Sequence, residues 1–461
     1  MKKVGKILLW IVLSLVFVVL LLLAINAFDE DLSPEATALV LEPGTPVPPN
    51  ENAYFTVFGF QAPPGQDAHA RGIEIVGEYE KILKADPFVD PVRSLDEMLG
   101  KDRLQFKGDE KKLCSRSPDS SRCITYYMGN TGDVDRLLAD NKLLLERYFK
   151  LTSYPHYRET LPVVVASPLP HLSFVRMAHQ LMLAKTALLV KEGKVAAALS
   201  QLQRDAVFNR RMAEEGSTLI SKLIALSLLS SDARALSEII AANKLSAVDI
   251  ARANAILKPL SAAERNFNKA FRNEAAVMRN AVSDGIKEGK FFTIYGASSR
   301  WDRVKWQLVR PFYKPNATIN VLSKNYAHIV ELDALSAKDL AERTGSGKEA
   351  EFIRAAQALR WDMVYNPVGK FIVAIAIPDF TGYLVRGHKA DGLMRLVSLQ
   401  LLLKENRIQD ARLEQFIKES GPRYADPYTG GVMRWDEKKR TLYFESIDTS
   451  YTLKERIEVA L

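Results

Sequence analysis

STLISKLIALSLLSSDARALSEIIAA, residues 217–242, decides the fold class. Apolar side chains cover nearly every face of this stretch when it is drawn as a helix. A helix that is apolar all round is buried on all sides, whereas a surface helix has one apolar face. The sequence therefore predicts a central helix here, with other helices packed around it.

Helical periodicity continues on both sides of this stretch. Upstream, apolar residues recur every three or four positions over 173–192 and 194–213, with Gly193 between the two segments. Helices joined by such tight breaks pack antiparallel. We therefore expect residues 133–360 to form an antiparallel helical domain, either a bundle or a solenoid-like array.

Start signals for further helices follow downstream. Ser246 precedes Asp249 by three residues, and Ser261 precedes Glu264 by three, which is the spacing of a capping box. A longer helix is expected over 317–344.

The segments on either side of this domain have weaker patterns. Residues 52–132 read as an irregular segment that contains both cysteines. Residues 361–461 read as a C-terminal helix–hairpin module, in which 432–435 pairs with 441–444. The predicted fold class is mainly α, with a small C-terminal β-hairpin.

The N-terminal segment is predicted to cross a membrane. Residues 7–25, ILLWIVLSLVFVVLLLLAI, carry no charge and contain Ser14 as the one hydroxyl. As a helix this run is roughly 28–30 Å long, which matches the hydrocarbon thickness of a bilayer. A cleaved signal peptide would have a shorter apolar core and a small residue where Ile25 stands. Residues 1–28 are therefore interpreted as a cytoplasmic tail and an uncleaved anchor, with membrane lipid contacting residues 7–25.

Charges around this segment predict its orientation. Lys2, Lys3 and Lys6 precede it, whereas acidic residues occupy 29–31. Basic residues are retained on the cytoplasmic side. We expect a single-pass protein of the bacterial inner membrane, with a cytoplasmic N-terminus and a periplasmic C-terminal domain. Residues 29–51 follow as a Pro-rich stalk, which should be extended and stiff.

The two cysteines agree with export. Cys114 and Cys123 flank a Ser- and Pro-containing turn. In an oxidising compartment we expect such a pair to form a disulfide. Zinc is the alternative, but two thiols need further ligands and no histidine is near in sequence.

Composition argues against a nucleic-acid partner. The net charge is +8 over 63 basic and 55 acidic residues, and three of the basic residues belong to the membrane-flanking tail. The remaining surface is mixed in sign, whereas nucleic-acid-binding domains concentrate basic residues.

Motifs for nucleotides and metals fail on spacing. TGSGK at 344–348 has Glu342 where a phosphate-binding loop needs Gly, and Glu349 where it needs Ser or Thr. The six histidines form no His-x-x-x-His pair; His171 and His179 lie about two helical turns apart. We expect no nucleotide, no cofactor, no metal and no identifiable catalytic residue.

One loop is the best place for chemistry if there is any. Asp67 stands two residues before His69 in a Gly- and Pro-rich stretch, and a carboxylate beside an imidazole can orient it as a general base. The alternative interpretation is a solvated loop held by neighbouring aromatic side chains.

Four patches carry a family resemblance: NAYFTVFGFQAPPGQDAHARG (52–72), PFYKPNATIN (311–320), YNPVGK (365–370) and YADPYTGGVMRWDEKKRTLYF (424–444). On these patches the chain resembles an uncharacterised family of single-pass, inner-membrane-anchored periplasmic proteins of proteobacteria. The last patch, with the helix before it, is also similar to a C-terminal module of other exported bacterial proteins, including pseudopilins. The resemblance implies an inner-membrane location and transfers no catalytic residue.

Three functions remain open at this point. The leading hypothesis is a membrane-tethered periplasmic interaction or assembly protein that binds an envelope protein. The second is an envelope hydrolase or transferase whose site is assembled from separate helices. The third is a pseudopilin-like secretion component, although prolines follow the apolar segment and the segment contains no Glu. Whether the chain is an enzyme is left open, with a binding role favoured.

Overall fold

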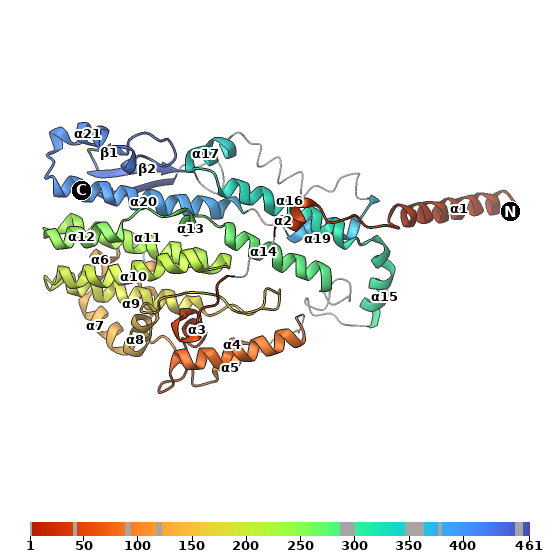
Figure 1. Ribbon diagram of the computed structural model, residues 1–461, viewed down its shortest axis with the longest axis horizontal. Coiled ribbons are helices and arrows are strands. Elements are labelled where there is room, and N and C mark those ends of the chain that lie inside the picture. The colour runs from red at the N-terminus through yellow and green to blue at the C-terminus, as the bar shows by residue number, and fades with distance from the viewer. Residues whose placement is uncertain are drawn as a thin grey trace.

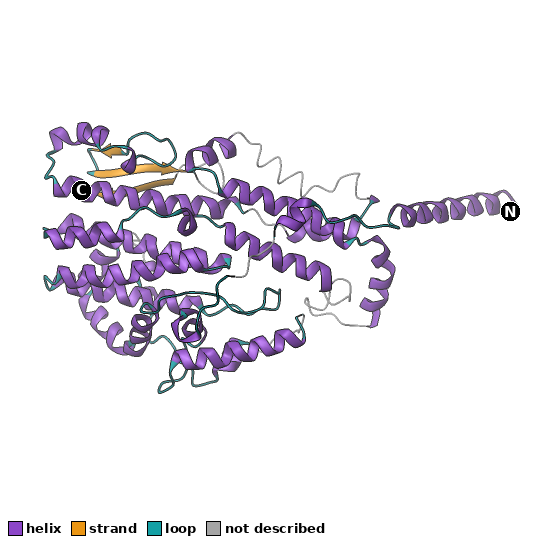
Figure 2. Ribbon diagram, in the orientation of Figure 1, coloured by secondary structure: helices purple, strands orange, loops and turns teal. Residues whose placement is uncertain are grey.

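The computed structural model describes residues 2–39, 44–87, 94–116, 122–285, 300–345, 364–376, 380–447 and 455–461. Helices dominate these residues, and three strands lie near the C-terminal end of the chain (Figure 2). The mainly α class is confirmed, together with one apolar N-terminal helix and a small C-terminal antiparallel sheet.

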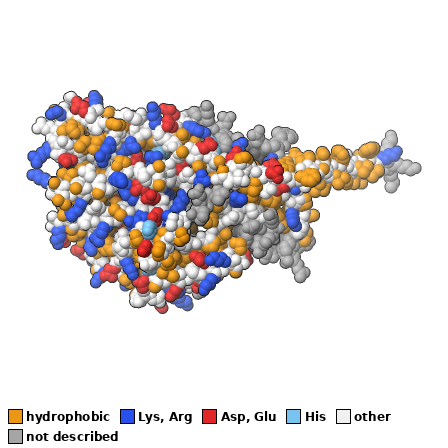
Figure 3. All heavy atoms as spheres, viewed as in Figure 1, with side chains coloured by type: hydrophobic (Ala, Val, Ile, Leu, Met, Phe, Trp, Pro, Cys, Tyr) orange, Lys and Arg blue, Asp and Glu red, His pale blue; other side chains and the backbone are white. Residues whose placement is uncertain are grey.

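Helix α1, Lys2–Ile25, projects from the molecule as an isolated rod (Figure 1). Its segment Val4–Ile25 is long and apolar enough to cross a membrane, and the body of the protein does not bury it. Figure 3 shows hydrophobic side chains along this rod, whereas the visible face of the body mixes Lys and Arg with Asp and Glu. A helix that is apolar all round needs apolar surroundings, and the body does not supply them.

The core of the body is a stack of four long helices (Figure 1). These are α9 (Leu172–Lys191), α10 (Val195–Glu215), α11 (Leu219–Ala242) and α20 (Thr381–Glu405). Helix α11 packs on α9, α10 and α20, and also contacts α6, α14 and strand β3. The prediction of a central helix at 217–242 is therefore correct.

Shorter elements surround this stack. In the N-terminal half they are α2 (Pro34–Ala38), α3 (Ala53–Phe58), α4 (Ala68–Ala85), α5 (Leu95–Leu99), α6 (Cys123–Gly129), α7 (Thr131–Asp140) and α8 (Lys142–Leu151). In the C-terminal half they are α12 (Ala247–Ile256), α13 (Ala262–Arg265), α14 (Asn268–Asn280), α15 (Arg300–Val309), α16 (Pro315–Asp333), α17 (Ala337–Gly345), α19 (Pro367–Ala376) and α21 (Asp410–Glu419). Single short turns are η1 (Pro49–Glu51), η2 (Glu110–Lys112), η3 (Cys114–Arg116), η4 (Ala281–Gly285), η6 (Arg310–Phe312) and η8 (Pro422–Tyr424).

Both predicted capping boxes are present. The Ser246 hydroxyl accepts from the Asp249 backbone N–H while the Asp249 carboxylate accepts from the Ser246 backbone N–H, each at 3.2 Å. The second box, at Ser261, opens only the four-residue helix α13. The helix predicted over 317–344 is two helices, because Ser336 accepts from the Asp339 backbone N–H and starts α17 anew.

The segment 52–132, expected to be irregular, contains helices α3 to α6. Helices α3 and α4 cross with their backbones in contact at two glycines. A Cβ on Gly72 would lie 1.6 Å from the Phe55 carbonyl oxygen, and one on Gly59 would lie 1.9 Å from the Ala68 carbonyl oxygen. Only residues without a side chain allow this approach.

The C-terminal sheet has the order β1–β2–β3 and packs on α20. Its strands are β1 (Arg434–Asp436), β2 (Thr441–Ser446) and β3 (Glu455–Ala460). The predicted hairpin is confirmed with Trp435 opposite Leu442. The third strand was not predicted; it pairs antiparallel with β2 and places Val459 opposite Leu442.

A second, smaller group of buried side chains lies at the end of the body where α1 leaves it (Figure 1). This basal cluster consists of Ala36, Val282, Trp306, Tyr313, Ile319, Leu322, Ile372 and Val373. The segment after α1, expected to be part of an extended stalk, packs here through α2. Polar contacts hold it in place, since Asp29 accepts from the backbone N–H groups of Asn316 and Ala317 at 2.9 and 3.1 Å.

The end of α1 is fixed to the same region. Asn26 accepts from the Asn366 backbone N–H at 2.8 Å and donates to the Val364 carbonyl at 2.8 Å. Asn320 of α16 donates to Glu30 at 3.0 Å. The rod is therefore joined to the body by direct hydrogen bonds at the point where it emerges.

Candidate functional sites

The structure places Asp67 at the N-cap of α4. One carboxylate oxygen accepts from the backbone N–H groups of His69 and Ala70, both at 2.9 Å, and the other accepts from Lys150 at 2.6 Å. The hydrogen bond from Lys150, with those from the backbone, lowers the pKa of Asp67 to about 2. The carboxylate contacts the backbone of His69 and thereby starts the helix.

The His69 ring has partners at both nitrogens. Nδ1 lies 2.7 Å from the Thr56 hydroxyl, Nε2 lies 2.9 Å from the Pro49 carbonyl, and the ring stacks on Tyr154 at 4.7 Å between centroids. Burial lowers the pKa of His69 and thereby favours the neutral ring. These contacts give the His69 ring a structural role in packing. Catalysis here would require the ring to exchange these partners.

A different group of ionisable side chains converges inside the helical stack. His179 of α9, Asp205 of α10 and Asp232 of α11 are all buried, with at most 2% of each exposed. His179 Nε2 lies 3.0 Å from an Asp232 oxygen and 3.3 Å from an Asp205 oxygen. We call these three residues the His–Asp–Asp cluster.

Two neighbouring polar side chains complete the cluster. The Tyr148 hydroxyl of α8 donates to Asp205 at 2.6 Å. Asn209 of α10 donates to Asp205 at 2.9 Å and to Asp232 at 3.2 Å. The four consecutive helices α8 to α11 therefore each contribute at least one polar side chain to this buried cluster.

Charges within the cluster are balanced by protons. Burial lowers the pKa of His179, but hydrogen bonds and charges from Asp205 and Asp232 outweigh it and raise the pKa to about 10. Burial and the charge of Asp205 raise the pKa of Asp232 to about 8. The protonated imidazole is thus hydrogen-bonded to acidic side chains, which avoids an uncompensated buried charge.

The same three side chains offer ligand atoms for a metal ion. One atom from each lies within 4.8 Å of the other two. Ligand atoms about 2.0–2.2 Å from a tetrahedral ion are themselves roughly 3.3 Å apart, so the present separations suit either an ion or a shared proton. His179 Nδ1 has no partner among the described residues, whereas metal-bound histidines usually donate from their second nitrogen. An imidazolium also carries a proton on Nδ1, so this feature does not separate the two arrangements.

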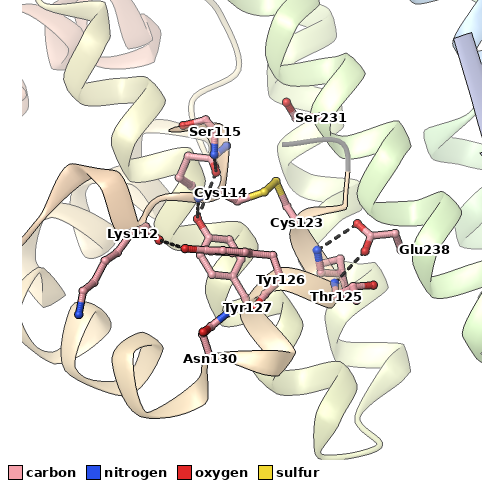
Figure 4. The surroundings of a disulfide bond; sticks show 12 residues. Lys112, Cys114, Ser115, Cys123, Thr125, Tyr126, Tyr127, Asn130, Ser231 and Glu238 are labelled. Atoms are coloured by element: carbon pink, nitrogen blue, oxygen red, sulfur yellow. Dashed lines mark hydrogen bonds between the residues drawn. A yellow bond between two sulfur atoms is a disulfide. The ribbon is translucent and has the colours of Figure 1, made fainter. Parts of the chain in front are cut away.

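The predicted disulfide joins Cys114 and Cys123, whose Cα atoms are 5.4 Å apart (Figure 4). Its surroundings link it to the core stack. The Cys114 backbone N–H donates to the Tyr127 hydroxyl at 2.9 Å, and that hydroxyl donates to Gln180 of α9 at 3.1 Å. The bond thus fixes η3 to α6, which packs on the core helices α9 and α11.

Helix α6 is also tied to α11 by a carboxylate. Glu238 accepts from the backbone N–H groups of Ile124 and Thr125 at 3.0 and 2.7 Å (Figure 4). These are free N–H groups of the first helical turn, which favour an anion. The cysteine pair is therefore a structural staple within the body.

An open groove of about 290 Å³ lies between α11, α20 and β3. Its apolar lining residues are Leu223, Leu226, Leu393 and Ile457. Arg234, Arg386 and Lys389 supply three cations and Glu455 one carboxylate. Among the described residues, Glu455 forms an ion pair with Lys389, and the charges of Glu455 and Glu458 also act on Arg234. Arg386 is the exposed guanidinium of the groove. We call this the cationic groove.

The two arginines of the groove differ in their surroundings. Burial lowers the pKa of Arg234, with Glu455 and Glu458 opposing the shift. Arg386 is exposed and its guanidinium lies 5.7 Å from the centre of the Tyr383 ring. Apolar walls with a few convergent charges are typical of binding sites.

Sequence reasoning missed both the cluster and the groove. His179, Asp205 and Asp232 are separated by 26 and 27 positions, so no linear motif contains them. A signal was present nonetheless: the largely apolar stretch 217–242 contains four ionisable residues, Lys222, Asp232, Arg234 and Glu238. A charge on a buried helix requires a partner. The groove depends on β3, which was not predicted.

Comparisons with protein-family models, with curated proteins and with solved structures give no match to this chain.

Proposed function

We propose that this protein is a membrane-tethered periplasmic interaction or assembly protein of the bacterial cell envelope. In this proposal α1 lies in the inner membrane, the N-terminus is cytoplasmic and the helical body is periplasmic. Lysines before α1 and acidic residues after it support that orientation. The Cys114–Cys123 disulfide is in keeping with an oxidising compartment.

The cationic groove is the observation that carries the binding role. It is open, and it is lined by apolar side chains and by the cations of Arg234 and Arg386. The partner is then an acidic segment of an envelope protein, with apolar side chains that cover Leu223 and Leu226. By contrast, the His–Asp–Asp cluster is closed to solvent, so a substrate cannot reach it without separating α9, α10 and α11.

Site-specific photocrosslinking in living cells tests the groove. Ser227 is exposed and lines it, so Ser227→p-benzoylphenylalanine should give one adduct of defined mass. Charge reversal by Arg386→Glu should abolish the adduct, whereas Arg412→Glu on α21 should leave it intact. Val248→p-benzoylphenylalanine on α12 is the matched control, since Val248 is exposed outside the groove. Equal adducts from both positions, or none from Ser227, would contradict the proposal.

Topology has its own test. Alkaline phosphatase fused after Leu461 should be active, because it folds only when exported. A fusion that is inactive, beside an active cytoplasmic reporter at the same position, would reverse the orientation.

The convergence of His179, Asp205 and Asp232 favours a second candidate, an envelope hydrolase or transferase that uses a metal there. Metal analysis of the purified full-length chain decides between the two. One equivalent of a bound transition metal that is lost in Asp205→Asn would favour the enzyme. A metal-free chain of normal stability would favour the binding role.

A further inference from the structure

Exposed apolar side chains gather at the end of the body where α1 emerges. On α15, Val304 and Leu308 are one turn apart and therefore share a face, and Leu308 is 72% exposed. On α19, Phe371 is 57% exposed. Phe28, in the link after α1, is 83% exposed. Large apolar side chains gathered in this way mark a contact surface.

The opposite faces of both helices are already packed. Trp306 of α15 is buried in the basal cluster, and so are Ile372 and Val373 of α19. The outward residues Leu308 and Phe371 are thus not part of the protein core. Each helix therefore has one apolar side that packs on the body and a second apolar side that is exposed.

The position of this surface relative to α1 is fixed. Ala36 of the segment after α1 belongs to the same basal cluster, and Asn26 is hydrogen-bonded at Val364 and Asn366, just before α19. Helices α15 and α19 lie at the α1 end of the body (Figure 1). Any bilayer that contains α1 therefore ends close to these helices.

We infer that α15 and the outer side of α19 lie on the bilayer surface, with Leu308, Val304 and Phe371 inserted at the boundary between headgroups and acyl chains. This inference rests on the proposed anchoring of α1. Lys305 and Arg310 are exposed on either side of Leu308. Their charges suit anionic headgroups while their aliphatic stems remain near the apolar layer. The body is then held against the membrane surface and does not stand away from it on a stalk.

The position of these exposed apolar side chains next to α1 favours lipid over a protein as the partner of this surface. Exposed apolar side chains follow α1 at Phe28, recur at Val364, whose carbonyl accepts from Asn26, and recur again at Phe371 on α19. A protein partner at this position would have to share the space with the headgroups that surround α1. Interfacial helices with apolar and basic residues lie in this plane of the bilayer.

Fluorescence quenching from within the lipid tests the contact. The full-length chain is placed in nanodiscs of phosphatidylethanolamine and phosphatidylglycerol, one chain per disc, so that a second copy cannot cover the surface. A bimane label is attached at Leu308→Cys or Phe371→Cys, while the native cysteines are protected by their disulfide. Lipids with a nitroxide near the headgroup or deep in the acyl chain act as quenchers.

Labels at 308 and 371 should lose emission most strongly with the shallow quencher. The matched control is Val248→Cys on α12, which is 60% exposed at a position away from the α1 end; it should lose none. A label at Val16→Cys in the middle of α1 should respond to the deep quencher, and this reports on anchoring alone. Quenching at 16 with none at 308 and 371 would overturn the surface contact and leave the anchor intact. No quenching at 16 would overturn the anchor itself.

Discussion

Replacement of His179 by glutamine should change how the stability of the protein depends on pH. In the folded protein the pKa of His179 is raised from 6.5 to about 10. A group whose folded pKa is raised stabilises the fold fully below its unfolded pKa, and the contribution is lost as pH rises through the folded pKa. His179 therefore contributes most below pH 6.5 and nothing above about pH 10.

The size of the effect follows from the shift. Each pKa unit corresponds to about 1.4 kcal/mol, so the protonated His179 contributes roughly 3–5 kcal/mol to the free energy of unfolding. His179→Gln keeps a side chain that can donate to Asp232 but carries no charge. The loss should be roughly 3–5 kcal/mol at pH 6 and should shrink towards a small packing term at pH 10.

Urea unfolding followed by circular dichroism measures this difference at pH 6, 8 and 10. The full-length chain is kept in nanodiscs, so that α1 remains in lipid while the body unfolds. Val248→Ala, on α12 outside the cluster, is the control; it removes no titratable group and should shift stability equally at each pH. A destabilisation by His179→Gln that is the same at pH 6 and pH 10 would refute the charged-histidine reasoning.

Three further predictions come from the described contacts. Cys114→Ser should lower the free energy of unfolding by about 2–3 kcal/mol, the chain-entropy value for so short a loop, and reduction of the native protein should reproduce the loss in the same urea assay. Gly72→Ala should destabilise the body strongly, because the new Cβ would lie 1.6 Å from the Phe55 carbonyl oxygen. Gly77→Ala on the same helix has open space and should stabilise the body by about 0.5–1 kcal/mol. Equal melting temperatures for the two variants would contradict the close crossing of α3 and α4. Burial lowers the pKa of Lys222 from 10.5 to about 7. The contribution of Lys222 to the free energy of unfolding therefore rises with pH between those values, opposite in sign to that of His179. In Lys222→Met this rise should vanish, and a pH profile unchanged from the native one would show that Lys222 is charged in the fold.

Local signals in the sequence were sufficient for most of the fold. The capping pair at Ser246 and the apolar stretch 217–242 each specify a helix through nearby residues alone, and both predictions are confirmed. Helix α4 was missed because Gly72 and Gly77 interrupt its pattern, although Gly72 is there for a contact with α3. Such a contact is tertiary, and helical propensity does not report it.

The candidate sites could not be predicted in the same way. The His–Asp–Asp cluster joins three helices, and its members become neighbours only after α9, α10 and α11 have packed. The groove requires β3, a strand that pairs with β2 across a break in the pattern. The sequence identified Asp67 and His69 because they are close in the chain, but the structure gives each of them separate structural partners. Helix packing determines which aspartates on different helices become neighbours.

The hydrogen bond between Asn26 and Asn366 spans 340 positions of the chain. At a synthesis rate of about 5–20 residues per second, Asn26 precedes Asn366 from the ribosome by roughly 20–70 s. During that interval the segment around Ala36 has no native neighbours on the α16 and α19 side, because those helices do not yet exist. The contacts that join α1 to the body are consequently among the last to form, and until then these hydrogen bonds do not fix the orientation of α1 relative to the body.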